Sequence, residues 1–312
     1  MEMKEEFLWV ERYRPRVIDD CILPDPIKKT FTTLRDKGEI INLLLSGPAG
    51  TGKTTVARAL CEELGSDYII INGSETRGID MVRNQVASFA GTMSTNGKTK
   101  VIILDEADYI TPEAQAALRN LMESFSKNCR FIFTCNFKHK IINPLHSRTS
   151  VIDFSFDKKD LPSLQAQMAK RTFDILNIEK VEFSKPAVID IIKRFTPDNR
   201  RILNELQRYA NINGNIDSGL FAVIDSSKVQ NFVNYMKSGD FKSCRQFIAD
   251  NPDPDVIFTE LYEGINSFVE PSSIPNLILI LGEYQMRAAH VANQEINLAA
   301  MCVECMKNVK WK

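Results

Sequence analysis

The stretch GPAGTGKTT at residues 47–55 constrains the fold more than any other part of the sequence. It matches the pattern G-x-x-x-x-G-K-[ST] in full, follows the apolar run NLLLSG and precedes the helix-like run TTVARALCEEL. A glycine-rich turn between a strand and a helix lets successive backbone N–H groups point at phosphates. An incidental glycine-rich turn would lack this context, so the sequence predicts a nucleoside triphosphate site.

Individual residues of this turn have separate expected roles. Lys53 is expected to reach the β- and γ-phosphates of ATP, and Thr54 to bind Mg²⁺. ATP and Mg²⁺ are therefore the expected cofactors. The other residues of the turn that we expect to contact the nucleotide are Gly47, Gly50, Thr51, Gly52 and Thr55.

Two later runs supply the groups that hydrolysis would need. VIILDEAD at 101–108 reads as a buried strand that ends in Asp105, expected to complete the Mg²⁺ shell, and Glu106, expected to polarise the attacking water. The next strand ends in FTCN and leaves Asn136 at the edge of the sheet that faces the ligand, where its amide can hold that water. The alternatives are a solvated strand-end charge for Glu106 and a turn residue for Asn136.

The alternation of short apolar runs and amphipathic helices over residues 40–110 predicts an α/β fold with a parallel sheet. After about residue 158 the patterns are helical. We expect three domains: a nucleotide-binding α/β domain at 1–157, a small helical domain at 158–227 and a second helical domain at 228–312.

Charge and cysteine content limit the kinds of partner that we expect and indicate a cellular location. The net charge of −1 gives no global signal for nucleic acid, so any such binding must use a local patch. The apolar run LILIL at 277–281 is too short to span a bilayer, and we expect no membrane partner. Seven irregularly spaced cysteines are typical of a reduced protein, and we expect a cytoplasmic location.

The motifs, taken in this order and spacing, resemble those of AAA+ clamp-loader ATPases: the phosphate-binding turn, LDEAD, FTCN and SRT. The short N-terminus, IDDCILP at 18–24 and the terminal WK look closer still to the large subunits of T4-type phage clamp loaders, which would place the chain in the host cytoplasm. Four further stretches are similar to boxes of the replication factor C small subunits: WVERYRP at 9–15, NGSETRGIDMVR at 72–83, TPEAQAALRNLME at 111–123 and PDNRRILNELQ at 197–207.

This resemblance covers nearly the whole chain. It implies an AAA+ P-loop domain with a parallel sheet, a small helical lid domain and a helical collar domain that oligomerises. It also implies that the chain is the ATPase of a DNA sliding-clamp loader, which opens the clamp when it holds ATP. Hydrolysis of ATP to ADP and phosphate, stimulated by primer–template DNA, would then release the loader.

The resemblance also assigns site residues. Arg200 is implied to sense the γ-phosphate from the lid, with Arg201 as the alternative. Arg148, in Ser147-Arg148-Thr149 where the family has S-R-C, is implied to reach the ATP of a neighbouring subunit. The competing interpretation of Arg148 is a salt bridge within the subunit, although no acidic residue precedes it within four positions. The residues implied to lie over the adenine are Val10, Glu11, Arg12, Tyr13 and Ile22.

The implied partners are the sliding clamp, a different small loader subunit, further copies of this chain in a five-subunit spiral, and primer–template DNA. Helix N-termini suit phosphates, so the DNA backbone is expected there. A basic residue at the place of Arg77 is also implied to restrain Glu106 until DNA arrives. The residues expected to bind DNA are Arg77, Arg83, Thr111 and Gln115.

Two other functions remain open. One is another AAA+ DNA motor, such as a branch-migration helicase, although no strand-separating or pore-loop element is evident in the sequence. The other is a scaffold subunit that keeps ATP without hydrolysing it. The presence of Lys53, Asp105, Glu106 and Arg148 argues against the scaffold.

Overall fold

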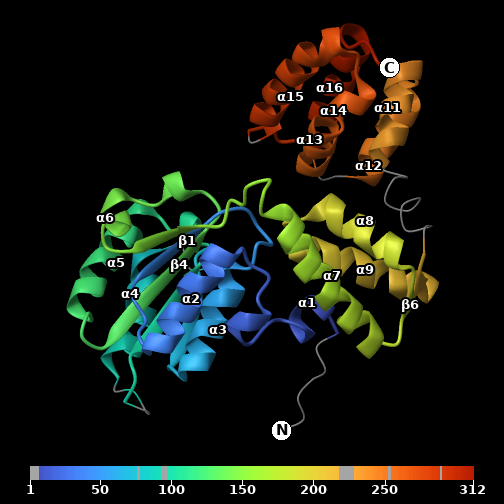
Figure 1. Cartoon of the computed structure of the whole chain (residues 1–312). Coiled ribbons are helices and arrows are strands. Elements are labelled where there is room, and N and C mark those ends of the chain that lie inside the picture. The colour runs from blue at the N-terminus through green and yellow to red at the C-terminus, as the bar shows by residue number, and fades with distance from the viewer. Residues whose placement is uncertain are drawn as a thin grey trace. The chain divides into compact units, whose positions relative to one another are not determined.

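The computed structural model describes residues 7–75, 78–92, 94, 97–217, 228–251, 254–288 and 290–312 (Figure 1). The chain forms two compact units, Met1–Asp217 and Ser218–Lys312. The predicted division at residue 157 lies inside the first unit. Within the described residues, no helix is both long enough and apolar enough to cross a membrane.

The first unit contains a parallel sheet with strand order β2-β3-β4-β1-β5. This confirms the predicted α/β fold with a parallel sheet. The strands are β1 (Leu43–Ser46), β2 (Tyr68–Asn72), β3 (Lys100–Asp105), β4 (Cys129–Cys135) and β5 (Ser150–Asp153). The helices around it are α2 (Asp25–Lys37), α3 (Lys53–Leu64), α4 (Ile79–Gly91), α5 (Pro112–Ser124) and the short α6 (Asn143–His146).

Both faces of the sheet are buried, because successive strand side chains point to opposite sides. In β3, Val101 and Ile103 join the core that contains α2 and α3, whereas Ile102 and Leu104 join the core that contains α4 and α5. This two-sided burial explains why the strands read as continuous apolar runs in the sequence.

The strand order places the ends of three strands, β1, β3 and β4, at one edge of the sheet. β4 pairs in parallel with β1 on one side and with β3 on the other. The carboxyl ends of these strands are therefore neighbours, and ligands of such sheets bind at that edge. This edge carries the phosphate-binding turn after β1, Asp105 as the last residue of β3 with Glu106 directly after it, and Asn136 after β4.

The rest of the first unit is helical. The N-terminal helix α1 (Trp9–Arg12) packs on α9: Trp9 is buried and its backbone N–H donates to Oε1 of Gln207 at 2.9 Å. The chain then continues through η1 (Ile18–Asp20), which contacts α2 and α3. We call α7 (Leu161–Ile178), α8 (Lys185–Phe195) and α9 (Asn199–Asn213) the lid helices; the short strands β6 (Glu182–Phe183) and β7 (Asn215–Ile216) pair beside them.

The second unit is helical in its described part, as the sequence predicted. Cys244, Cys302 and Cys305 are all buried in its apolar core. Its helices are α11 (Lys228–Ser238), α12 (Phe241–Asp250), α13 (Pro254–Glu263), α14 (Ile265–Phe268), α15 (Ile274–Ala288) and α16 (Gln294–Asn308), with η4 (Pro271–Ser273) before α15.

A buried lysine fixes the C-terminal end of α4. Lys100 is only 4% exposed; its Nζ donates to the Phe89 carbonyl at 3.0 Å and to Oγ1 of Thr92, and it lies 4.7 Å from the centroid of the Phe89 ring. The last carbonyls of a helix carry partial negative charge, so a cation there is stabilising. Lys100 therefore ties α4 to the start of β3.

We predict that Lys100→Met lowers the free energy of unfolding by about 1–3 kcal/mol, because methionine keeps the apolar stem but loses both charge-assisted hydrogen bonds of Nζ. Urea denaturation followed by circular dichroism measures the change. Lys127→Met is the control: Lys127 is exposed, so this change should stay within about 0.5 kcal/mol. Equal losses in both variants would remove the anchoring role of Lys100.

Candidate nucleotide site

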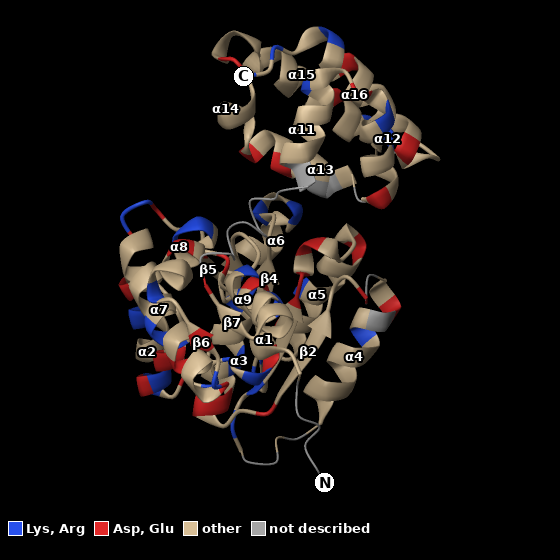
Figure 2. Ribbon diagram, turned by 90° about the vertical axis from the view of Figure 1, so that its right-hand side faces the viewer, with Lys and Arg blue, Asp and Glu red and all other residues tan. Residues whose placement is uncertain are grey.

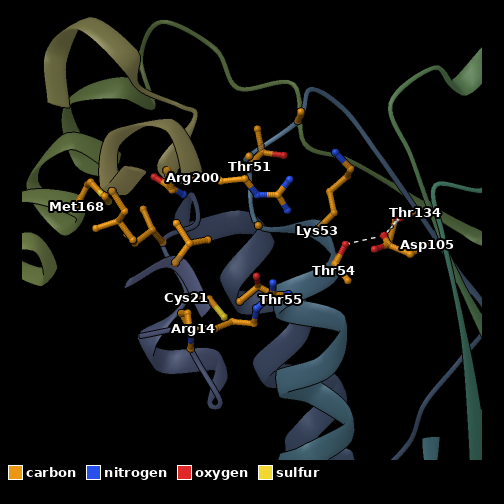
Figure 3. Close-up of a pocket in the computed structure, with 18 of the residues that line it drawn as sticks. Arg14, Cys21, Thr51, Lys53, Thr54, Thr55, Asp105, Thr134, Met168 and Arg200 are labelled. Carbon is orange, nitrogen blue, oxygen red and sulfur yellow. Dashed lines mark hydrogen bonds between the residues drawn. The ribbon is translucent and has the colours of Figure 1, made fainter. Parts of the chain in front are cut away.

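One cavity of the first unit is walled by the N-terminal segment, the phosphate-binding turn, the carboxyl edge of the sheet and the lid helices (Figure 3). Most of the predicted nucleotide and catalytic residues meet there although they lie far apart in the sequence. The predicted residues that line it are Val10, Tyr13, Ile22, Gly50, Thr51, Gly52, Lys53, Thr54, Thr55, Asp105, Glu106, Asn136 and Arg200.

Several residues that line the cavity were not predicted from the sequence. Arg14 and Pro15 belong to WVERYRP, so the motif itself could have indicated them. Met168 and Leu203 occupy apolar helical positions that look like ordinary core. Arg171 gave no signal, yet its guanidinium lines the cavity and donates to the backbone carbonyl of Tyr13 at 2.6 Å. The other missed residues are Ala49, Cys21, Thr134, Cys135 and Asn199.

Asp105 and Thr54 form the oxygen-rich corner of the cavity. Thr54 Oγ1 donates to Oδ1 of Asp105 at 2.6 Å, and Thr134 Oγ1 donates to the same oxygen (Figure 3). A hydroxyl and a carboxylate are the hard oxygen ligands that Mg²⁺ prefers. The residues present therefore fit a Mg²⁺ ion bound beside phosphates.

Lys53 is held by uncharged acceptors. Its Nζ donates to the carbonyls of Gly47 and Pro48, each at 2.7 Å, and to Oδ1 of Asn136 at 3.1 Å. Burial lowers the pKa of Lys53 from its ordinary value, and the nearby Arg200 acts in the same direction. A buried cation with only dipoles as partners gains most from an anion, so phosphate oxygens would be stronger partners than the present ones.

Glu106 has an unusual backbone at the cavity edge. Its φ is 53°, in the left-handed region, and its N–H donates to Thr134 Oγ1 at 3.1 Å. Such conformations cost on the order of 1–3 kcal/mol and gather at functional sites. The segment after β2 packs closely here: Gly73 N–H donates to the Asp105 carbonyl at 2.7 Å, and a Cβ on Gly73 would lie 2.4 Å from the Glu106 carbonyl oxygen.

The first turn of α9 lies on the phosphate-binding turn. Asn199 N–H donates to the Gly50 carbonyl at 3.1 Å, and Asp198 caps α9 by accepting from Arg201 N–H at 3.0 Å. Of the two arginines, Arg200 lines the cavity and extends towards the turn (Figure 3), whereas the Arg201 guanidinium lies 4.4 Å from the centroid of the Phe195 ring. The placement favours Arg200 for contact with phosphate.

Three predicted nucleotide contacts do not line the cavity. Arg12 donates to Glu179 at 2.8 Å, and Glu11 pairs with Arg14. Gly47 offers its carbonyl to Lys53 and is not part of the wall.

The residues expected to bind DNA have different surroundings. Arg83 is exposed on α4. Thr111 is the N-cap of α5 and its Oγ1 accepts from Ala114 N–H at 3.4 Å. Arg77 lies outside the described residues.

The prediction that Gln115 contacts DNA is wrong. Its side chain is 1% exposed and lies on the buried face of α5. Its Nε2 donates to the carbonyls of Ile110 and Lys140 at 2.9 and 3.1 Å, and its Oε1 accepts from Ile142 N–H at 2.9 Å. Gln115 therefore joins α5 to the segment that follows β4.

Arg148 forms a salt bridge within its own subunit. This was the alternative to the interpretation in which Arg148 acts in trans, on the ATP of a neighbouring subunit. Its Nε and Nη2 both donate to Oε1 of Glu123, at 2.9 and 2.6 Å. Glu123 lies 25 residues earlier, in the last turn of α5, so a search for nearby acidic residues in the sequence could not find it.

Comparison with known families gives three matches along the chain. Residues 43–157 match the ATPase family associated with various cellular activities (AAA). Residues 160–222 match the AAA+ ATPase lid domain of the sliding-clamp-loader large subunit, and residues 256–310 match the C-terminal domain of that subunit.

Individual proteins show the same likeness over nearly their whole length. The chain is 34% identical to the sliding-clamp-loader large subunit of Enterobacteria phage T4, over 99% of this chain and 98% of that protein. The large subunit of Escherichia phage RB69 gives the same values. The replication factor C small subunit of Archaeoglobus fulgidus is 33% identical, over 94% of this chain and 95% of that protein.

Among solved structures, the Holliday junction branch migration motor RuvB of Thermotoga maritima aligns with a TM-score of 0.54 at 18% identity. The alignment covers 72% of this chain and 78% of that one. At this identity the likeness shows the fold alone.

We predict that Gly50→Ala weakens ATP binding about tenfold. A Cβ at Gly50, where φ is +75°, would lie 1.8 Å from Oδ1 of Asp198. Asp198 must move and lose its cap on α9, which costs about 1 kcal/mol, and the lid helices must withdraw from the turn. Isothermal titration with ATP measures the affinity.

The matched control is Gly38→Ala. Gly38 has a similar φ of +69°, and a Cβ there would meet nothing within 4 Å. It should lower the thermal midpoint through backbone strain and leave ATP affinity unchanged. If both variants bind ATP like the wild type, contact between α9 and the turn does not support the nucleotide site.

Proposed function

Because the chain belongs to the sliding-clamp-loader family of AAA+ ATPases, we propose that it is the subunit that couples ATP hydrolysis to clamp loading on DNA. It opens a sliding clamp in the ATP-bound state, and hydrolysis on primer–template DNA releases the loader. The observation that carries this proposal is the convergence of Lys53, Asp105, Glu106 and Arg200 on one cavity between the sheet and the lid helices.

Binding of ATP would use all four walls of the cavity. Val10, Tyr13 and Ile22 give the base apolar and aromatic contact, and Met168 and Leu203 close its other side. The backbone of the turn, from Gly50 to Thr55, holds the phosphates. Thr54 and Asp105 would hold Mg²⁺, which neutralises phosphate charge when bound.

Hydrolysis would require Lys53 and Asn136 to exchange partners. Lys53 leaves its carbonyl acceptors for the γ-phosphate, and this releases Oδ1 of Asn136. Asn136 can then orient a water molecule while Glu106 accepts its proton. Arg200 reaches the same phosphate from the lid, so lid closure and the catalytic geometry are linked.

DNA would act through the helices beside the sheet. Arg83 and Thr111 are placed at or near helix starts, where the sequence-independent backbone of DNA can bind, and Arg77 is assigned the same role. Acidic and basic residues are interspersed on the ribbon (Figure 2), which agrees with DNA contacts made by a few local basic residues. The contact of Gly73 with Glu106 supports the proposal that the segment carrying Arg77 restrains Glu106 before DNA arrives.

The proposed assembly is a five-subunit spiral of copies of this chain with a different small subunit, which holds the sliding clamp. Because the cavity of each chain already holds Lys53 and Arg200 of its own, Arg148 is proposed to act as the arginine finger for the ATP of the next subunit.

The two alternatives are less well supported. The likeness to a branch-migration motor is one of fold alone, whereas the relatives along the full length are clamp-loader subunits. A non-hydrolysing scaffold would not need Glu106 and Asn136 beside Lys53 in one cavity.

The deciding experiment is a steady-state ATPase assay of the reconstituted loader with and without the clamp and primed DNA. We expect low basal turnover that rises when both are present. A rate that responds to neither would contradict the proposed function, and stimulation by branched DNA alone would favour the helicase.

We predict that Glu106→Gln retains ATP affinity and clamp opening but lowers the hydrolysis rate about 10²–10⁴-fold, because the amide cannot accept the proton. Nucleotide titration and single-turnover hydrolysis measure the two effects separately. Normal DNA-stimulated hydrolysis in this variant would eliminate Glu106 as the base.

We predict that Arg148→Ala retains folding and ATP binding but lowers DNA-stimulated hydrolysis about 10³-fold or more, as expected for an arginine finger. Loss of an exposed salt bridge alone would change stability by only about 1 kcal/mol or less.

Mixed rings test whether Arg148 acts in trans. In a ring of Arg148→Ala and Glu106→Gln subunits, some sites combine an intact base with a finger from the neighbour. These rings should regain activity that neither variant has alone. No recovery in rings shown to contain both variants would exclude action in trans.

A further inference from the structure

The guanidinium of Arg148 is fully engaged within its own chain. Nε and Nη2 donate to Oε1 of Glu123, at 2.9 and 2.6 Å. Nη1 donates to the carbonyl of Pro144 at 3.0 Å and to Oγ of Ser147 at 3.4 Å. Each of the three nitrogens therefore already has an acceptor, and a phosphate that binds the edge formed by Nε and Nη2 must displace Glu123.

Glu123 differs from the other two acceptors in its place in the fold. Pro144 and Ser147 belong to α6 and its C-cap, directly before Arg148, so they can move with the arginine. Glu123 lies on a different helix, α5. A movement of Arg148 towards another subunit would therefore break the contact with Glu123 first.

The Arg148–Glu123 pair is accessible and easily exchanged. The Arg148 side chain is 35% exposed and the Glu123 side chain 57%. A guanidinium binds carboxylates and phosphates with the same edge, so Glu123 and a γ-phosphate compete for Nε and Nη2. Once displaced, the Glu123 carboxylate can rotate into water without a large desolvation cost.

The charge of the neighbouring cavity explains why Arg148 needs the Glu123 carboxylate when no phosphate is bound. The cavity that Arg148 would approach in a neighbouring copy is itself lined by more cations than carboxylates: Arg14, Lys53, Arg171 and Arg200 against Asp105 and Glu106. Without phosphates, an unpaired Arg148 would add one more positive charge to this cluster at the interface. Glu123 neutralises Arg148 in that state.

We propose that Glu123 is the counter-ion of Arg148 while the neighbouring site lacks a γ-phosphate, and that Arg148 exchanges Glu123 for the γ-phosphate when ATP binds there. This inference rests on the proposed function, in which Arg148 acts in trans. Glu123 is then a positioning residue that helps the site to distinguish ATP from ADP. An exposed pair shifts an equilibrium about fivefold at most, whereas an arginine finger contributes about 10³–10⁵ in rate, so bound ATP wins the exchange.

The test is Glu123→Gln in the reconstituted loader with clamp and primed DNA. Glutamine keeps the size of the side chain and removes its charge. We expect KM for ATP to fall about threefold to fivefold, because the competitor of the γ-phosphate is weakened. The value of kcat should stay within about twofold, because Arg148 is bound to phosphate in the transition state of both proteins, and the inhibition constant of ADP should not change.

A matched control comes from the lid helices. Arg208 donates through Nε and Nη2 to a single oxygen of Glu205, at 3.1 and 2.6 Å, which is the geometry of the Arg148–Glu123 pair. Glu205→Gln should change neither KM nor kcat. Glu123→Asp keeps the carboxylate and should have a KM closer to that of the wild type. In an Arg148→Ala background, Glu123→Gln should have no additional effect.

Two results would overturn the inference. An unchanged KM would mean that Glu123 does not compete with phosphate, and a fall in kcat at constant KM would mean that Glu123 holds Arg148 in its active position. Either result is compatible with action of Arg148 in trans. Normal DNA-stimulated hydrolysis of Arg148→Ala would instead overturn the proposed function itself.

Discussion

The parallel pairing of β4 with both β1 and β3 is the constraint on which the rest of the site depends. It places the carboxyl ends of β1, β3 and β4 side by side, although long stretches of sequence separate these strands. The groups for phosphate, metal and water are thereby placed on a rigid sheet edge. The groups proposed to contact the base and the outer phosphate come instead from the N-terminal segment and the lid helices. The fixed and the movable parts of the site are therefore separate in the fold.

The electrostatics of the site follow one pattern. Cations that await phosphate are held by weak or displaceable partners: Lys53 by carbonyl and amide oxygens, and Arg148 by an exposed carboxylate. Burial makes the charged form of Lys53 less favourable, which the lowered pKa reflects. Each cation is thus expected to gain a stronger partner when phosphate binds.

The sequence predicted those parts of the site whose function depends on local spacing. The phosphate-binding turn, Asp105 with Glu106, and Asn136 each follow a recognisable strand, and the structure brings them together. Gln115 was misassigned because a polar residue near a helix start looks exposed, and only the tertiary structure shows the three backbone groups that it satisfies. The pairing of Arg148 with Glu123 and the contact of Arg171 with Tyr13 could not be predicted, because they join residues that are remote in sequence.

The docking of the N-terminal segment on α9 has a consequence for biosynthesis. The Trp9 backbone bonds to Gln207 across 198 positions of sequence, and the indole is 4% exposed in the finished fold. During synthesis the segment around Trp9 must wait for the lid helices before it is covered, and contacts of such long range form slowly. A chain interrupted before α9 would have no cover for Trp9 and no complete wall around the base. Competence to bind nucleotide is thus expected only after α9, which ends at Asn213, has been translated.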